Sequence, residues 1–236
     1  MVAAAICASL AHRGERVAAF KPAVTGLDGE PGEWGHDHEL LAATAGAGHS
    51  PGDVAPYRFG PAVSPHLAAE LGGVRIEPGR LVSAARAAAG SAHALVVEGV
   101  GGLMVPLTPG YLVRDFAVDL GLPVAIAART GLGTINHTLL TIEAARGAGL
   151  RVAAVVMTPW PKDPEPIERS NRETIERLGG VPVSSLARTA PDRLAEAGSG
   201  LVLDGWLDAP RTVAAPGVGS SRVVTDPKLR RPSTVT

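Results

Sequence analysis

The regular alternation of short apolar runs with helical segments is the feature that most constrains the fold of this chain. Apolar, often β-branched runs predict strands at residues 17–21, 94–98, 123–128, 151–157 and 181–186. Helical patterns lie around them, at residues 1–12, 39–45, 66–71, 79–89, 114–120, 136–147 and 166–178. Apolar strands that are separated by helices indicate a parallel sheet covered on both faces. The sequence therefore predicts an α/β fold with a doubly wound, mostly parallel sheet.

Composition and charge argue against several classes of function. The chain has 236 residues, of which 45% are hydrophobic and 19% charged, and its formal net charge is -1. A near-neutral chain without a basic stripe is not expected to bind nucleic acid, and aromatic residues, at 3%, are too few for base stacking. No apolar run is long enough to cross a bilayer, so no membrane contact is expected. The single cysteine, Cys7, cannot form an internal disulfide, which favours a cytoplasmic location.

The predicted elements divide the chain into a folded body and a tail. Residues 1–208 are expected to form a single α/β domain. Its first 13 residues are interpreted as a buried helix, because a targeting segment would carry a basic n-region. Residues 50–65 contain four prolines and are expected to lack regular structure. Residues 209–236 are rich in Pro, Gly, Ser and Thr without periodicity, so they are predicted to be a disordered tail.

Charged residues end two of the predicted strands, where doubly wound sheets bind their ligands. Lys21 is followed by Pro22, and it is either a cation pointing into a cleft or an exposed lysine at a turn. Thr25 is a candidate hydroxyl ligand or a turn residue. Glu98 is followed by a glycine-rich run at residues 99–102. A buried carboxylate requires a partner, which is either a metal ion or lysine in a ligand site or a structural salt bridge.

The segment His36-Asp37-His38-Glu39 invites an interpretation as a zinc site. Its spacing lacks the paired ligands that a closed zinc site requires, so we reject zinc. Asp37 alone is a better candidate, as an oxygen ligand for Mg²⁺.

A glycine-rich turn at residues 129–135 leads into the predicted helix 136–147. Free backbone N–H groups and the positive end of the helix dipole make such a turn a receptor for a carboxylate or phosphate. The alternative is an ordinary connection with Thr134 or Asn136 as the N-cap.

Taken together, these segments resemble the dethiobiotin synthetase family, in order and with compatible spacing over residues 2–204. The matching pieces are Lys21-Pro22 with Thr25-Gly26, Ser64-Pro65-His66, Glu98-Gly99 with Gly101-Gly102, and Gly133 with Ile135-Asn136-His137. The run LGTINHTLLT is the most distinctive of them. The resemblance implies a sheet of the P-loop NTPase type and a carbon-nitrogen-bond-forming cyclo-ligase of biotin biosynthesis.

The resemblance also implies the substrates and the reacting groups. ATP is the co-substrate, Mg²⁺ the cofactor, and 7,8-diaminopelargonate and CO₂ are the substrates. In the family the diamine and CO₂ form a carbamate, ATP phosphorylates the carbamate, and the second amine closes the ureido ring. Lys21 matches the lysine that holds the carbamate and the γ-phosphate, which makes it the catalytic residue. Asp37 and Glu98 match the two magnesium-linked carboxylates, which also contact ATP.

Further residues match the binding positions of the family. Thr25 matches a contact to the diamine or its carbamate, and Gly99, Val100 and Gly101 border the nucleotide. The turn comprising Gly133, Thr134, Ile135 and Asn136 resembles the one that receives the substrate carboxylate. In the family it does so across a two-fold interface, which implies a homodimer. Thr158 and Pro159 match the contacts to adenine, but the asparagine common there is missing, which leaves the nucleotide preference open.

The sequence departs from the family pattern in its phosphate loop. No Gly-x-x-x-x-Gly-Lys-Ser/Thr motif occurs, because none of the three lysines follows a glycine. In the family this loop and its strand precede the helix that residues 2–11 match. We therefore expect either a start upstream of Met1 or a truncated polypeptide that binds ATP poorly and is inactive. The alternatives are a nucleotide-free dimeric binding module, that is a decayed paralogue, and a related cobyrinic-acid-type amide-forming ligase.

Overall fold

A computed structural model describes residues 1–207, so the predicted tail at residues 209–236 lies outside the described residues. Its main strands run parallel, as predicted. β1 (Val17–Phe20) pairs with β4 (Ala94–Val97), and β8 (Val152–Trp160) lies between β7 (Val124–Ala128) and β9 (Val183–Ala187). The α/β class with a mostly parallel sheet is thereby confirmed.

The seven predicted helices lie close to their predicted positions, and the described residues form two additional short helices, α3 and α9. The helices are α1 (Val2–His12), α2 (Asp37–Ala45), α3 (Pro51–Val54), α4 (Pro65–Leu71), α5 (Pro78–Ala89), α6 (Val113–Leu120), α7 (Thr134–Gly147), α8 (Pro166–Gly179) and α9 (Leu194–Gly198). Two short 3-10 helices span Pro191–Arg193 and Leu203–Gly205. Within the described range, no helix combines the length and the apolar character needed to span a membrane.

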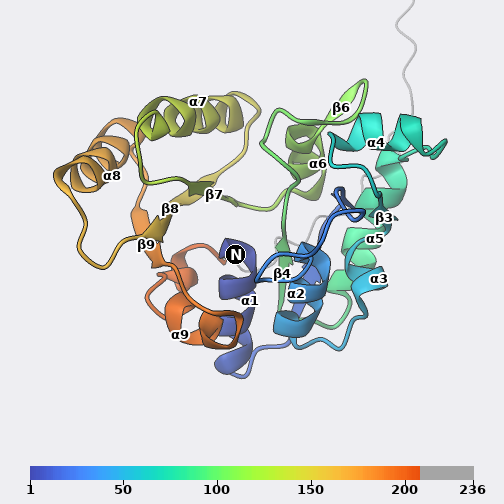
Figure 1. Cartoon of the computed structure of the whole chain (residues 1–236), viewed down its shortest axis with the longest axis horizontal. Helices are drawn as coiled ribbons and strands as arrows, with labels where there is room; N and C mark the ends of the chain where they lie inside the picture. The colour runs from blue at the N-terminus through green and yellow to red at the C-terminus, as the bar shows by residue number, and fades with distance from the viewer. Residues whose placement is uncertain (208–236) are drawn as a thin grey trace, which may run out of the picture.

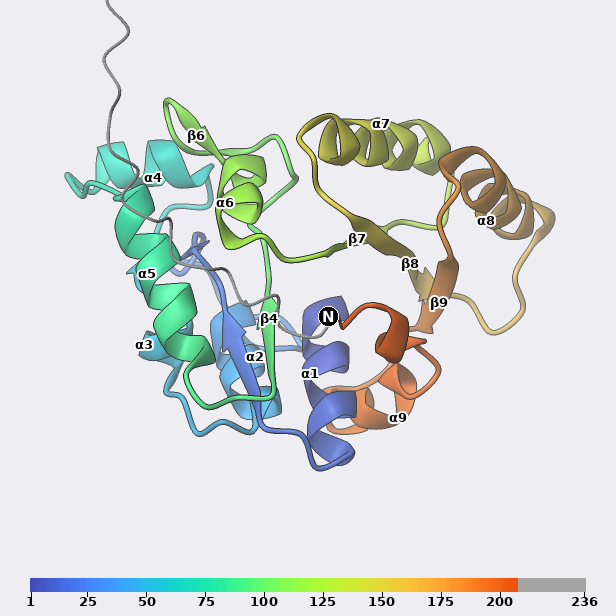
Figure 2. The ribbon, with the colours of Figure 1, turned by 180° about the vertical axis from the view of Figure 1, so that it is seen from behind.

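Helices cover both faces of the parallel strands (Figures 1 and 2). The β1–β4 pair buries one face against α5 and α6, in a cluster that includes Phe20, Leu81 and Phe116, and the other face against α1 and α2. The β7–β8–β9 sheet packs one face on α7 and α8, and on the other face β8 and β9 pack on α1 and α9. The helix α1 therefore packs against both groups of strands, and its apolar residues belong to the cluster that joins them.

The parallel sheet is in two parts. Within residues 1–207, β4 pairs only with β1 and β7 pairs only with β8, so each of the two strands keeps one unpaired edge. The side chains of β4 are only half buried, and Ala125 and Ala127 of β7 are exposed. Unpaired edges present free N–H and C=O groups and invite further strand pairing.

The prediction that residues 50–65 lack regular structure was wrong in part. Pro51 opens α3, where a missing N–H costs nothing because the first N–H groups of a helix are unpaired. Ser50 and Asp53 cap that helix reciprocally, since each side chain accepts a hydrogen bond from the other's backbone N–H. The strand β3 (Tyr57–Arg58) then pairs in parallel with β2 (Ala23–Val24).

Three further elements were missed. The strands β5 (Pro106–Thr108) and β6 (Tyr111–Leu112) form an antiparallel hairpin, and α9 packs on α1. Strands of two or three residues are too short to show an alternating pattern, and a helix of five residues spans less than two turns.

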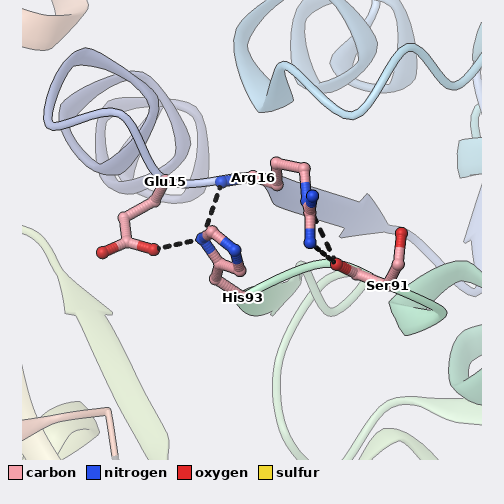
Figure 3. A network of polar contacts seen from close by, with 4 residues as sticks. All are labelled: Glu15, Arg16, Ser91 and His93. Carbon is pink, nitrogen blue, oxygen red and sulfur yellow. Dashed lines mark hydrogen bonds and ion pairs between the residues drawn. The ribbon is translucent and has the colours of Figure 1, made fainter.

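A polar network ties the chain together at the amino ends of β1 and β4 (Figure 3). His93 Nδ1 lies 2.7 Å from Glu15 Oε2, and the Arg16 guanidinium donates to the Ser91 carbonyl oxygen. This network lies at the end of the strands opposite to the one where Lys21 and Glu98 follow.

Stability is expected to decline at alkaline pH through Cys7. Burial raises the pKa of this thiol from 9.0 to about 12. The unfolded chain therefore ionises above pH 9.0 while the folded chain keeps its proton, so this contribution is complete below pH 9.0 and is lost as the pH rises toward 12. We expect the free energy of unfolding to fall by about 1.4 kcal/mol per pH unit relative to Cys7→Ala. Urea titrations at about pH 8 and pH 10 measure this; a difference independent of pH would contradict it.

Candidate active site

Three charged side chains meet at the carboxyl ends of β1 and β4. Lys21 Nζ lies 2.5 Å from Glu98 Oε1 and 3.1 Å from Asp37 Oδ2. It also donates to the Gly99 carbonyl oxygen at 3.2 Å. The Lys21 side chain is 5% exposed, Glu98 is 22% exposed and Asp37 is 56% exposed. The structure thus brings together three residues that lie far apart in the sequence, with the ammonium group between the two carboxylates.

The local backbone explains why the three side chains converge. Phe20 and Val97 are register partners at the ends of β1 and β4, so the residues that follow them, Lys21 and Glu98, leave the sheet side by side. The Glu98 N–H donates to the Phe20 carbonyl, and the Lys21 N–H donates to the Val54 carbonyl. Asp37 is the first residue of α2, which packs against β1.

The electrostatics of the cluster keep Lys21 and Asp37 charged. Burial works to lower the pKa of Lys21, but the Glu98 and Asp37 carboxylates outweigh burial and hold that pKa above its ordinary value of 10.5. Partial burial likewise works to raise the pKa of Asp37, and the Lys21 ammonium more than offsets this, so the pKa lies below 3.8. At neutral pH the site therefore presents a cation flanked by an ionised aspartate.

The donor set suits a magnesium ion better than zinc. Asp37 and Glu98 offer carboxylate oxygens, which Mg²⁺ prefers, and both remain partly open to solvent. Across the part of the chain that the structure describes, no group of three or more His, Cys, Asp or Glu side chains is placed to hold a metal ion. Mg²⁺ is commonly bound by one or two carboxylates together with substrate phosphates and water, and these two residues fit that pattern.

The glycine run after β4 has a backbone that side chains would disturb. Gly101 has φ +65°, and a Cβ there would lie 2.9 Å from Val105 Cγ2. A Cβ on Gly99 would lie 3.1 Å from Val113 Cγ1. The segment Gly99–Gly101, with Val100 9% exposed, therefore runs closely over the β5–β6 region directly beside Glu98.

Gly101→Ala is expected to destabilise the protein by about 1–3 kcal/mol, because it combines a left-handed backbone with a collision. Urea unfolding measures the loss. Gly102→Ala is the matched control, since its Cβ would meet nothing within 4 Å and its φ is not positive. Equal effects at both positions would show that the Gly101 backbone is not constrained.

The glycine-rich turn before α7 borders an open groove. A groove of about 470 Å³ is lined by Leu132, Gly133, Ile135, Asn136, Leu139, Leu140, Glu143 and Asn171. Helix α7 starts at Thr134, with Gly133 as its N-cap at φ +87°, so neither Thr134 nor Asn136 is the N-cap. Leu132 at the tip of the turn is 95% exposed and Leu140 is 60% exposed.

The other predicted site residues are distributed as follows. Thr25 follows β2 in a loop whose next residues, 26–28, donate backbone hydrogen bonds to the carbonyl oxygens of residues 59–61. Thr158 and Pro159 lie within the carboxyl end of β8, joined by a cis peptide bond, and Thr158 Oγ1 is buried without a hydrogen-bond partner. Neither segment contacts the Lys21 cluster through a hydrogen bond or an ion pair among the described interactions.

Sequence reasoning missed Asn171. It lies on α8 and is 7% exposed, and its Nδ2 donates to the carbonyl oxygens of Thr130 and Gly131. The available signal was its spacing, because Asn171 stands four residues after Ile167 and four before the fully buried Ile175. A polar residue on the apolar stripe of an amphipathic helix indicates a buried hydrogen bond.

Comparison with known families assigns the class. A family described as "AAA domain" matches residues 1–187. Together with the parallel strands and their covering helices, this match makes the chain an α/β protein of the P-loop NTPase type. A solved ParA family ATPase from Chlorobium tepidum is a distant likeness, with a TM-score of 0.45 and 13% identity over 87% of this chain and 83% of that chain. That likeness is too weak to carry a conclusion.

Curated relatives narrow the class to one family. An ATP-dependent dethiobiotin synthetase BioD from Anaeromyxobacter dehalogenans is 40% identical over 75% of this chain and 78% of the relative. A protein of the same name from Rhodococcus jostii is 34% identical over 89% of this chain and 89% of the relative. Another, from Bacillus subtilis, is 32% identical over 78% of this chain and 78% of the relative. The chain belongs to the ATP-dependent dethiobiotin synthetase family, as its motifs predict.

Proposed function

We propose that this protein closes the ureido ring of dethiobiotin from 7,8-diaminopelargonate and CO₂, with ATP as co-substrate and ADP and phosphate as the other products. The observation that carries the proposal is the meeting of Lys21, Asp37 and Glu98 at the carboxyl ends of two parallel strands. Ligands of doubly wound sheets bind at this edge. Family membership supports the choice of substrates.

The proposed reaction has three steps. One amine of the diamine takes up CO₂ to give a carbamate, whose oxygen attacks the γ-phosphorus while the bond to ADP breaks. The second amine then attacks the carbamate carbon, the carbon–oxygen bond breaks, and phosphate leaves with that oxygen. In the first transfer negative charge builds up on the transferred group. Lys21 holds a fixed cation where that charge develops, which lowers the barrier without reorganisation.

Asp37 and Glu98 would hold Mg²⁺ beside this lysine. When bound, the ion neutralises charge on the nucleotide phosphates. The two residues also position Lys21, since both carboxylates contact its ammonium group. Gly99, Val100 and Gly101 border the nucleotide in this proposal, because a backbone without bulky side chains allows phosphates to approach closely.

The adenine base of the nucleotide is assigned to the end of β8. The sequence as given contains no Gly-x-x-x-x-Gly-Lys-Ser/Thr motif, whose backbone N–H groups usually cradle the phosphates. Thr158 and Pro159, at the carboxyl end of β8, are assigned to the base.

A direct assay tests the proposal. The protein, and a form extended by any in-frame upstream codons that encode a strand and a Gly-Lys-Thr loop, are incubated with the diamine, bicarbonate and Mg-ATP. Mass spectrometry then detects the ureido product. We expect product from the extended form. If the extended form yields no product, the ligase assignment is wrong.

A nucleotide-free binding module is the second candidate, favoured by the missing phosphate motif. Against it stands the charge cluster, because an abandoned site has no physical reason to keep two carboxylates around a buried lysine. Calorimetry separates the two candidates: a binding module binds the diamine with the same affinity whether or not Mg-ATP is present, whereas the enzyme binds both the diamine and Mg-ATP.

Nothing in the site favours a cobyrinic-acid-type ligase. The cytoplasmic location stays a prediction.

The substrate carboxylate is assigned to the turn comprising Gly133, Thr134, Ile135 and Asn136, in a homodimer. Leu132 and Leu140 expose large apolar surfaces beside this turn, and we propose that a second copy of the chain covers them.

Leu132→Glu is expected to convert the dimer to monomers, because a charge replaces a 95% exposed leucine at the contact between the two copies. Sedimentation equilibrium measures this. Leu178→Glu on α8, also exposed, is the control that should stay dimeric. A monomeric wild-type protein would remove the dimer from the proposal.

A further inference from the structure

Two buried polar side chains hold the turn before α7 from its inner side. Asn171 Nδ2 donates to the Thr130 carbonyl oxygen at 2.8 Å and to the Gly131 carbonyl oxygen at 3.2 Å. Thr134, which is 5% exposed, donates through Oγ1 to the Arg129 carbonyl oxygen at 2.6 Å. Three successive carbonyl groups of one turn thus accept hydrogen bonds from side chains of α7 and α8.

This arrangement fixes the direction of the turn's N–H groups. A peptide unit is planar, and its C=O and N–H point in opposite directions. Fixing the carbonyls of residues 129–131 therefore turns the N–H groups of residues 130–132 away from Asn171 and Thr134. Without those bonds the turn would be free to reorient, since Gly131 and Gly133 impose little conformational preference of their own.

The amide of Asn171 is not needed to fill space. Most of the residues that line the groove with it are apolar, among them Ile135, Leu139 and Leu140, so an apolar side chain would suit this lining. A buried amide is costly unless it is hydrogen-bonded, and Asn171 directs both of its described bonds to this one turn. Its distinctive contribution is therefore the orientation of the turn.

We propose that Asn171 is a positioning residue for substrate binding: from α8 it holds residues 129–132, and it thereby sets the position of the residues that follow directly, 133–136, whose N–H groups receive the substrate carboxylate. The proposal rests on the function proposed above, because it requires that the turn receive that carboxylate. Asn171 itself acts through the turn and does not touch the substrate.

Binding measurements with two ligands test this role without requiring turnover. Calorimetry compares 7,8-diaminopelargonate with 2,3-diaminononane, which is the same vicinal diamine with a methyl group in place of the carboxylate. Asn171→Asp keeps the shape but loses both donated hydrogen bonds. We expect it to weaken binding of diaminopelargonate about tenfold or more, and to leave binding of the methyl analogue within about twofold. Thr141→Val is the control, because the Thr141 hydroxyl donates only within α7, to His137.

The outcomes separate the two proposals. If the wild-type protein binds both ligands equally, the turn does not receive the carboxylate, and the assignment of the turn and the role of Asn171 both fall. If the wild-type protein prefers diaminopelargonate and Asn171→Asp keeps the full preference, the role of Asn171 alone is overturned. Circular dichroism checks folding, and where Asn171→Asp does not fold, Asn171→Ala, which leaves room for water, takes its place in the same comparison.

Discussion

Replacing Lys21 by glutamine is expected to lower kcat about a thousandfold while leaving the fold intact. The substitution removes the cation that faces both carboxylates at 2.5 and 3.1 Å, and with it the charge that stabilises phosphoryl transfer. The fold should survive because Asp37 is 56% exposed and Glu98 also reaches solvent, so water can solvate both carboxylates. Product formation by mass spectrometry gives the rate, and circular dichroism gives the fold.

Lys162→Gln is the matched control for this substitution. Lys162 is exposed in the segment after β8 and is the other lysine within residues 1–207, so its loss should leave the rate unchanged. Near-normal turnover of Lys21→Gln would mean that the cation has no part in the reaction. A variant that loses activity together with its circular dichroism signal would instead show that Lys21 is structural.

Replacing Glu98 by glutamine should have the next largest effect, a fall in kcat of about a hundredfold with a raised requirement for Mg²⁺. The change keeps the shape of the side chain but removes the charge that both holds Lys21 and offers an oxygen to the metal. Initial rates measured across a magnesium titration separate the two effects. Excess magnesium should restore part of the rate, because it compensates for weakened metal binding but not for the displaced lysine.

Glu15→Gln tests whether any lost glutamate ion pair has the same result. Glu15 contacts His93 at the amino ends of the same two strands (Figure 3), so the loss of the Glu15 carboxylate should affect stability alone.

An unchanged magnesium dependence in Glu98→Gln would exclude Glu98 as a metal ligand.

The convergence of Lys21 and Glu98 could be predicted because a simple rule governs it. The carboxyl ends of parallel strands lie at one edge of a sheet, so residues that end two apolar strands are neighbours whenever the strands pair. Asp37 was harder to place, because a loop joins it to Lys21 and only the packing of α2 against β1 brings the two together. Its position was proposed from the family resemblance and not from periodicity.

The contacts that depend on tertiary packing could not be predicted. The hydrophobic pattern of α8 shows which face is buried, but it does not show that Asn171 reaches the carbonyls of a turn 40 residues earlier. The short elements α3 and β3 were hidden by prolines, although Ser50 and Asp53 form a recognisable capping pair. A strand pattern does not reveal which strands are neighbours, so unpaired edges could be expected beside a missing strand, but their assignment to β4 and β7 required the structure.

The fate of the carbamate oxygen tests the central claim most directly, namely that the Lys21 cluster serves the phosphorylation of a carbamate. The form of the protein that gives product is supplied with the diamine, Mg-ATP and CO₂ labelled with oxygen-18. The reaction is stopped before CO₂ exchanges its label with water, and the released phosphate is analysed by mass spectrometry. The account predicts one labelled oxygen in the phosphate of each turnover, with labelled phosphate absent in Lys21→Gln. Unlabelled phosphate released at the rate of product formation would contradict it.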